Sequence, residues 1–181
     1  GDVFGNGLIQ SPKIRMIGAF NYMHIVCDPN PDAEKTYKER LRLFKAVKGW
    51  GDYDQSLLSE GGRIYLRSEK YLKLTPQIRK RFEIEDETIS PAELIKVMLR
   101  ARTDLLFFGG IGTYIKATKE TNNEVGDRSN DALRVDAQEI RAKVIGEGAN
   151  LAITQNGRIE MAMKGIHLNT DFIDNSAGVD T

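Results

Sequence analysis

The stretch Lys143-Val-Ile-Gly-Glu-Gly-Ala-Asn150 decides the fold, because an apolar, strand-like run passes directly into a loop of glycines and polar side chains. The same pattern occurs at Asp104-Leu-Leu-Phe-Phe108, which is followed by Gly109-Gly-Ile-Gly112. A third strand is predicted over 167–173, ahead of the polar segment 174–178. Ligands of open α/β sheets bind outside the carboxyl ends of the strands, where glycine lets the backbone approach them closely. One such loop is equally well explained as a tight turn, but three on neighbouring strands indicate a binding crevice.

Capped helices separate the predicted strands. Tyr37, Leu41 and Phe44 fall at i, i+4 and i+7 among charged residues, a spacing typical of an amphipathic helix. Thr75-Pro76 and Ser90-Pro91 each combine a hydroxyl N-cap with a proline at the first helical position. The other predicted elements are strands over 13–20 and 23–27, helices over 32–47, 91–101 and 158–164, and a polar loop over 118–134. This alternation predicts an α/β fold, with a mostly parallel sheet and helices on both of its faces.

Composition excludes several classes of function. The 181 residues are enough for one domain with a buried core. Twenty-six basic side chains balance twenty-six acidic ones, so charge does not favour binding to nucleic acid or to an anionic membrane. No apolar run approaches the roughly twenty residues of a membrane span, and no signal-peptide pattern opens the sequence, so we expect a cytoplasmic protein. His24 and His167 are too isolated for a metal site, and Cys27, the only cysteine, is predicted to be a small buried apolar residue.

Two C-terminal motifs resemble the superfamily of glutamate, leucine, phenylalanine and valine dehydrogenases. In that superfamily a strand ending in E-G-A-N and a later one ending in N-A-G-G form the floor of the nicotinamide pocket. The first motif corresponds to 147–150 here, and the second reads Asn175-Ser-Ala-Gly178, shifted by a serine.

The rest of the chain resembles one branch, the large multidomain bacterial NAD-specific glutamate dehydrogenases. The segments that carry this likeness are Asp28-Pro-Asn-Pro-Asp32, Trp50 with Asp52-Tyr-Asp54, Ser56-Leu-Leu-Ser59, Gly61-Gly62, Gly109-Gly-Ile-Gly-Thr-Tyr114 and Val125-Gly-Asp-Arg-Ser-Asn-Asp-Ala132. So many matched segments make a more specific signal than a single glycine loop would.

This resemblance implies a Rossmann-like dinucleotide-binding domain over 1–181, with a family-specific insertion at about 29–89. The activity implied for the full-length protein is oxidative deamination of L-glutamate to 2-oxoglutarate and ammonia, with NAD as the hydride acceptor. In the superfamily the substrate-activating lysine and the acid–base aspartate lie in a preceding domain, so we expect no catalytic residue in this chain and no activity from it alone. An unpaired sheet edge would also favour a homo-oligomer.

The resemblance also places the nicotinamide end of the cofactor. Asn150 and Asn175 are the first candidates, because a side-chain amide offers a donor and an acceptor to a carboxamide or a ribose hydroxyl. Their alternative role is strand-end capping or turn formation. The backbone of Gly109, Gly110 and Gly112 is expected to pass close to the cofactor, with Thr113 as a weaker hydroxyl contact. Glu147 is interpreted as orienting its loop rather than as an acid–base group.

The phosphate and ribose end of the cofactor site is less complete. By resemblance, Gly1 corresponds to the last glycine of the phosphate-binding fingerprint, so the first strand of the fold is expected to be missing. A ribose-binding acid is expected about twenty residues further on, where this chain has Asn21. Asparagine does not repel a 2′-phosphate, so NADP remains an alternative to NAD. Asp28 is another candidate ribose ligand, although its place before a proline also suits a turn.

A second hypothesis is a Rossmann-like binding or scaffold module without dehydrogenase activity. The expected loss of the first strand and the asparagine at position 21 favour it. The two hypotheses differ in whether the chain binds a reduced nicotinamide cofactor.

Overall fold

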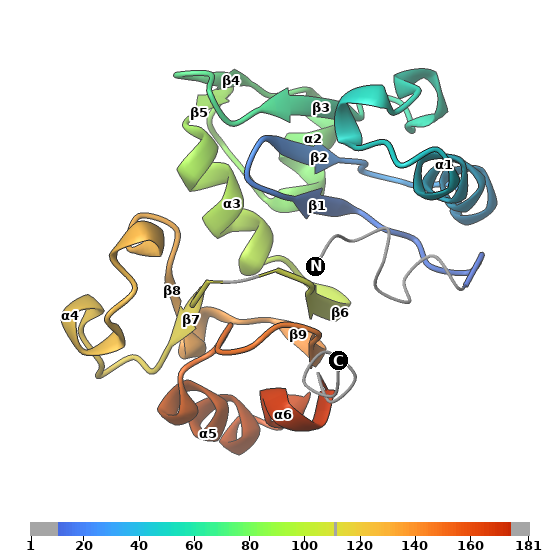
Figure 1. The fold of residues 1–181 in the computed structure, drawn as a ribbon. Helices are drawn as coiled ribbons and strands as arrows, with labels where there is room; N and C mark the ends of the chain where they lie inside the picture. The colour runs from blue at the N-terminus through green and yellow to red at the C-terminus, as the bar shows by residue number, and fades with distance from the viewer. Residues whose placement is uncertain (1–10, 111, 175–181) are drawn as a thin grey trace. The chain divides into compact units, whose positions relative to one another are not determined.

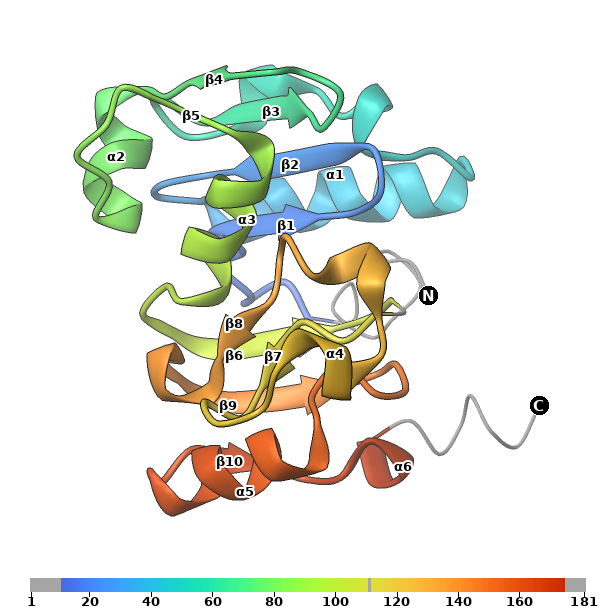
Figure 2. The ribbon, with the colours of Figure 1, turned by 90° about the vertical axis from the view of Figure 1, so that its left-hand side faces the viewer.

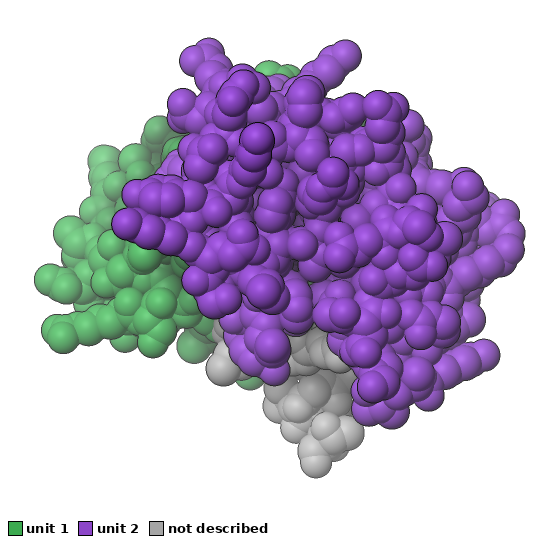
Figure 3. All heavy atoms as spheres, turned by 90° about the horizontal axis from the view of Figure 1, so that it is seen from above, with its two compact units in different colours: residues 1, 99–181 green, residues 2–98 purple. Residues whose placement is uncertain are grey.

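The structure is a computed structural model that describes residues 11–110 and 112–174. The candidate residues Gly1 and Asn175 therefore lie outside the described residues. The chain divides into two compact units, residues 2–98 and residues 1 and 99–181 (Figure 3). These are called the N-terminal unit and the C-terminal unit below, and each is described by itself.

A parallel sheet of three strands, in the order β10-β9-β6, organises the C-terminal unit (Figure 1, and Figure 2 for β10). The strands are β6 (Thr103–Phe108), β9 (Ala142–Glu147) and β10 (His167–Leu168). Phe108 of β6 pairs with Glu147 of β9, so these two strands end level with each other. The three strands predicted to precede polar loops are thus present and adjacent, and the α/β class is confirmed.

Two elements at the C-terminal side differ from the prediction. The strand expected over 167–173 ends at Leu168, because residues 171–174 form the short helix α6 (Asp171–Asp174), which opens with the Ile173 N–H bonded to the Thr170 carbonyl at 3.0 Å. Helix α5 (Gln155–Met163) begins three residues earlier than expected, since the Thr154 hydroxyl caps it by accepting from Gly157 N–H at 3.1 Å.

The polar segment predicted as a loop contains some regular structure. Its helix is α4 (Asn122–Val125), with a capping box formed by Thr121 and Glu124. A two-stranded parallel sheet, β7 (Ile115–Lys116) with β8 (Val135–Asp136), flanks it. Short 3₁₀ turns occupy Arg128–Asn130 and Ala137–Glu139.

The two faces of the parallel sheet differ in burial. Ile145 and Phe108 are buried at 2% and 5% exposure, and Ile153 and Met161 of the segment after β9 are also buried. Leu105 and Val144, which are register partners, remain 42% and 41% exposed.

The N-terminal unit contains an antiparallel sheet in the order β1-β2-β3 (Figure 2). Its strands are β1 (Gly18–Phe20), β2 (His24–Cys27) and β3 (Arg63–Leu66), with a small antiparallel pair β4 (Leu72–Lys73) and β5 (Thr88–Ile89) beside them. The first strand is therefore shorter than the expected 13–20. Only three residues join β1 to β2, too few for a parallel crossover. The parallel arrangement predicted from the sequence thus applies to the C-terminal unit.

The predicted helix starts are confirmed in the N-terminal unit. Its helices are α1 (Ala33–Lys45), α2 (Pro76–Phe82) and α3 (Pro91–Leu99). Asp32 accepts from Glu34 N–H and Lys35 N–H at the start of α1, and Thr75 accepts from Ile78 N–H at the start of α2. Two short 3₁₀ turns, Trp50–Asp52 and Gln55–Leu57, follow α1. Val26 of β2, Leu43 of α1, Trp50 and Tyr53 form one buried apolar cluster.

Cys27 lies at the end of β2 with no exposed surface, as predicted. Burial, assisted by the neighbouring Asp28 carboxylate, raises the pKa of this thiol well above its ordinary value. Because the thiolate is the reactive form, we expect a thiol reagent at neutral pH to leave native Cys27 unmodified. In denaturant the same reagent should modify one thiol per chain, and rapid labelling of the native protein would contradict this.

Within the described residues, no helix has both the length and the apolar content needed to cross a bilayer.

Candidate functional site

The loops that follow β6 and β9 meet at the carboxyl ends of these two strands. The Thr113 hydroxyl donates to the Leu151 carbonyl at 2.7 Å. Next to this bond, Tyr114 N–H donates to the Ala152 carbonyl at 2.8 Å. The glycine loop after β6, represented here by Gly109, Gly110, Gly112 and Thr113, and the loop 148–154 are therefore held together, at the place where ligands of parallel sheets bind.

The buried Arg134 holds the glycine loop in place. Its Nε donates to the Thr113 carbonyl at 2.9 Å, and its Nη2 donates to the Asp127 carbonyl at 2.6 Å. Its Nη1 donates to Asn122 Oδ1 at 2.9 Å and to Asp131 Oδ1 at 2.5 Å. Because the side chain is only 1% exposed, these bonds replace its hydration. The segment 125–132, which carries part of the family likeness, thus contributes acceptors for one arginine.

Asp127 binds the backbone N–H of Thr113, whose carbonyl is bound by Arg134. Its Oδ2 accepts from Thr113 N–H at 2.9 Å and from Asn130 Nδ2 at 2.7 Å. The bond from Thr113 N–H, followed by Asn130 and the charge of Arg134, holds the pKa of Asp127 below its usual range. The carboxylate is therefore ionised at neutral pH and accepts hydrogen bonds rather than protons.

Gly112 has a backbone conformation that other residues rarely adopt. Its φ is +117°, and an added Cβ would lie 2.7 Å from Asn130 Nδ2. We expect Gly112→Ala to destabilise the C-terminal unit by about 1–3 kcal/mol, because the strain and the contact act together. Urea unfolding would measure it. The matched control is Gly126→Ala, where φ is +76° and no atom lies within 4 Å of the added Cβ. Equal losses in the two variants would contradict a steric role for Gly112.

A buried ion pair anchors the second loop. Arg158 of α5 donates to Glu147 through Nε at 2.8 Å and through Nη2 at 2.9 Å. The side chains are 7% and 1% exposed. Such bidentate pairs fix geometry as well as charge. The pair therefore ties the end of β9 to α5 at the base of the loop that carries Asn150.

Helix α6 contributes two carboxylates to the same loop. Asp174 Oδ2 accepts from Glu147 N–H at 3.1 Å, and Asp171 Oδ2 accepts from Leu151 N–H at 3.0 Å. Asp171 Oδ1 also lies 3.5 Å from Arg158 Nη2. The segment after β10 thus contacts the loop after β9, so all three strand ends contribute to one region.

The ionisation of Glu147 is constrained by this setting. Burial raises the pKa of Glu147 above its usual range, although the Arg158 guanidinium opposes the change. Both carboxylate oxygens are bonded to Arg158. This arrangement fits the interpretation of Glu147 as a residue that orients its loop, since an acid–base group needs a free oxygen within reach of a substrate.

The structure groups five of the candidate cofactor residues in the C-terminal unit. They are Gly109, Gly110, Gly112, Thr113 and Asn150. Asn150 is solvent-exposed within the loop 148–154. The Thr113 hydroxyl donates to the Leu151 carbonyl.

The two ribose candidates belong to the N-terminal unit and have structural partners. Asn21 Oδ1 accepts from Met23 N–H at 2.9 Å and from His24 N–H at 2.7 Å, which closes the turn between β1 and β2. Asp28 is 1% exposed, and its Oδ1 accepts from the N–H of Ser59 at 3.1 Å and from the hydroxyl of the same serine.

Sequence reasoning missed the residues that support the loops. Arg134, Arg158 and Asp171 are ordinary charged residues, and no local pattern separates them from surface charges. Asp171 falls inside the strand predicted over 167–173, so the prediction did not mark it as a loop residue.

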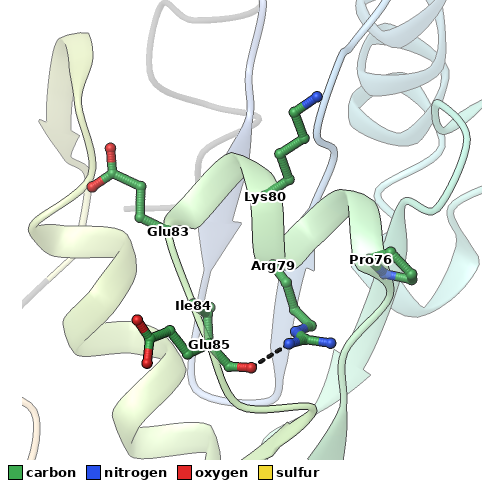
Figure 4. Close-up of a pocket in the computed structure, with 6 residues that line it drawn as sticks. All are labelled: Pro76, Arg79, Lys80, Glu83, Ile84 and Glu85. Carbon is green, nitrogen blue, oxygen red and sulfur yellow. Dashed lines mark hydrogen bonds between the residues drawn. The ribbon is translucent and has the colours of Figure 1, made fainter.

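The N-terminal unit has a hollow at α2, and the described residues contain no metal site. The hollow, of about 470 Å³, is lined by Pro76, Arg79, Lys80, Glu83, Ile84 and Glu85 at α2 (Figure 4). The Arg79 guanidinium within it donates to the Glu85 carbonyl and lies 3.5 Å from Glu87. It includes none of the candidate residues. No group of three or more histidine, cysteine, aspartate or glutamate side chains in the described ranges is arranged to hold a metal ion.

Comparison with known proteins gives a consistent result. Residues 1–181 match the family described as bacterial NAD-glutamate dehydrogenase, catalytic domain. The chain is 54% identical to the NAD-specific glutamate dehydrogenases of Halomonas elongata, over 180 residues, and Pseudomonas aeruginosa, over 181 residues. It is 51% identical to that of Mycobacterium tuberculosis over 187 residues. Each match covers 99% of this chain but only 11–12% of the relative, so the chain spans about a ninth of these proteins.

Proposed function

Because the chain belongs to the family of bacterial NAD-glutamate dehydrogenase catalytic domains, we propose that it forms the nicotinamide side of the cofactor site in an NAD-dependent glutamate dehydrogenase. The observation that carries this proposal is the junction of the loops after β6 and β9, fixed by the bond from the Thr113 hydroxyl to the Leu151 carbonyl. It places glycine backbone and the exposed Asn150 at the carboxyl ends of adjacent parallel strands.

The residues of this junction fit a nicotinamide cofactor. Gly109, Gly110 and Gly112 carry no side chains of their own, which suits close approach of a ribose and a planar ring to their backbone. The Asn150 amide offers the donor and the acceptor that complement a carboxamide. When bound, the cofactor accepts the hydride from the α-carbon of L-glutamate, and the resulting imine hydrolyses to 2-oxoglutarate and ammonia.

The residues of this chain then act by binding and orienting. Asn150 would fix the plane of the ring, and the buried Glu147–Arg158 pair would keep the Asn150 loop from moving during the reaction. Lysine and aspartate side chains that act on the substrate are assigned to another part of the protein. The proposed domain is Rossmann-like over 1–181, with an insertion at about 29–89.

Cofactor titration tests this proposal. NADH added to the purified chain should enhance or shift nicotinamide fluorescence and raise the midpoint of thermal unfolding, because a ligand that binds the folded state stabilises it. Glutamate-dependent formation of NADH should be seen with the whole enzyme and not with this chain alone. Activity of the chain alone would contradict the assignment of the catalytic lysine to another domain.

A binding or scaffold role without cofactor remains the second candidate. The observation that favours it is the engagement of Asn21 and Asp28 in structural hydrogen bonds of the N-terminal unit. If the whole protein fails to bind NADH, this alternative replaces the first. NADPH in a parallel titration separates the two nicotinamide cofactors, and we expect NADH to bind more tightly.

A further inference from the structure

Leu151 combines a strained backbone with an exposed apolar side chain next to the proposed cofactor ligand. Its φ is +58°, one of three positive values at non-glycine positions among the described residues. For a residue without a short polar side chain this conformation is uncommon and costs free energy. The side chain is 65% exposed, so no packing in the described structure compensates for the strain.

Hydrogen bonds on both sides keep Leu151 in this conformation. Its N–H donates to Asp171 Oδ2 at 3.0 Å, and its carbonyl accepts from the Thr113 hydroxyl at 2.7 Å. Asp171 is held in turn by Arg158, whose Nη2 lies 3.5 Å away. Two segments of the C-terminal unit therefore hold the backbone of one residue, and a third supports Asp171. Backbone strain that is fixed from several sides is characteristic of ligand-binding positions.

We propose that Leu151 is a cofactor-contact residue, whose apolar side chain packs against the nicotinamide ring bound by Asn150. This inference rests on the proposed function and adds a second residue to the same site. An apolar side chain beside a planar heterocycle buries surface from both and excludes water from the ring, which favours hydride transfer over side reactions. The hydrogen bonds to Thr113 and Asp171 fix the Leu151 backbone before the cofactor binds, and so the direction of the Cα–Cβ bond of Leu151.

Three variants of the whole enzyme separate this role from a structural one. Leu151→Asn retains a residue that tolerates the left-handed conformation but removes the apolar contact. Leu151→Gly removes both the strain and the contact, and Leu151→Met keeps an apolar side chain. Each is measured by NADH titration, thermal unfolding and the KM values for NAD and glutamate.

In both the asparagine and the glycine variant we expect stability and cofactor affinity to change in opposite directions. The midpoint of thermal unfolding should equal or exceed that of the parent enzyme, because strain is relieved. The dissociation constant for NADH and the KM for NAD should rise roughly tenfold, as partial loss of one buried leucine contact predicts. The KM for glutamate should change little, and Leu151→Met should bind NADH within about threefold of the parent enzyme.

The outcomes are distinguishable. If the parent enzyme binds NADH and the asparagine and glycine variants bind it equally well, the assignment of Leu151 is wrong while the proposed function stands. Loss of stability together with unchanged affinity would identify Leu151 as a packing residue and also overturn the inference. If the parent enzyme does not bind NADH, both the proposed function and this inference fail.

Discussion

Replacing Arg158 by methionine is expected to destabilise the C-terminal unit by about 3–5 kcal/mol, the range found when one partner of a buried ion pair is removed. Glu147 is 1% exposed, and both of its carboxylate oxygens are bonded to Arg158. Methionine fills a similar volume but leaves that carboxylate without a counter-charge. Urea unfolding of the chain, with hydrogen exchange of residues 142–154, would measure the loss.

A surface pair on the same sheet provides the matched control. Lys143 lies 2.7 Å from Asp104, and the two side chains are 75% and 89% exposed. Lys143→Met should leave the unfolding transition nearly unchanged, because solvent screens exposed pairs. The double variant Glu147→Leu/Arg158→Met removes both buried charges and should recover most of the stability lost in the single variant. A single variant as stable as the parent chain would show that the pair is not buried in solution.

The loss in free energy of unfolding caused by Arg158→Met, called the deficit below, should also depend on pH. Burial raises the pKa of Glu147, and Arg158 is the main group that lowers it. Without Arg158 the pKa in the folded state rises further, while the unfolded value stays at about 4.3. A carboxyl whose pKa is raised by folding stabilises the folded state at low pH, and this contribution is lost as the pH rises through the folded-state pKa. The deficit relative to the parent chain should therefore be smaller at about pH 5 than at about pH 8. A deficit independent of pH would contradict this account of the Glu147 environment.

The strands of the parallel sheet could be predicted from the sequence because each is marked by residues adjacent in the chain. Apolar runs ending at Phe108 and near Ile145 are followed at once by glycines or polar residues, a pattern typical of strands in a parallel sheet. The starts of α1, α2 and α3 could also be predicted from the sequence. Asp32, Thr75 and Ser90 accept hydrogen bonds from backbone N–H groups no more than three residues away.

Other features depend on contacts that are distant in sequence. Helix α6 replaces the end of a predicted strand because Asp171 and Asp174 face backbone donors of Leu151 and Glu147, 20 and 27 residues earlier. The partners of Asn21 are local, yet no sequence rule chose between a cofactor ligand and the turn-forming role that its side chain has in the structure. Charged residues such as Arg134 acquire their roles only when the fold brings hydrogen-bond acceptors around them, here two backbone carbonyls and two side chains.

The largest effect on function is expected at Asn150. In the whole enzyme, Asn150→Asp should lower kcat/KM for NAD by about 100-fold, equivalent to about 2.7 kcal/mol. Aspartate has the same shape but lacks the amide donor, and it places a negative charge beside the carboxamide oxygen of the ring. An unmet hydrogen bond together with this repulsion accounts for a loss of that size. Steady-state kinetics with varied NAD, and NADH titration, would measure it.

Asn150→Asp should weaken cofactor binding and leave the stability of the fold largely unchanged. Asn150 is solvent-exposed and aspartate has nearly the same shape, so the thermal unfolding midpoint should change much less than the affinity for NAD. The control is Asn123→Asp, which makes the same change at an exposed position of α4 and should leave the KM for NAD unchanged. A fall in activity with NAD affinity retained would assign Asn150 to the substrate rather than the cofactor. Unchanged kinetics would remove it from the site, and the junction fixed by Thr113 and Leu151 would then need another ligand-binding side chain.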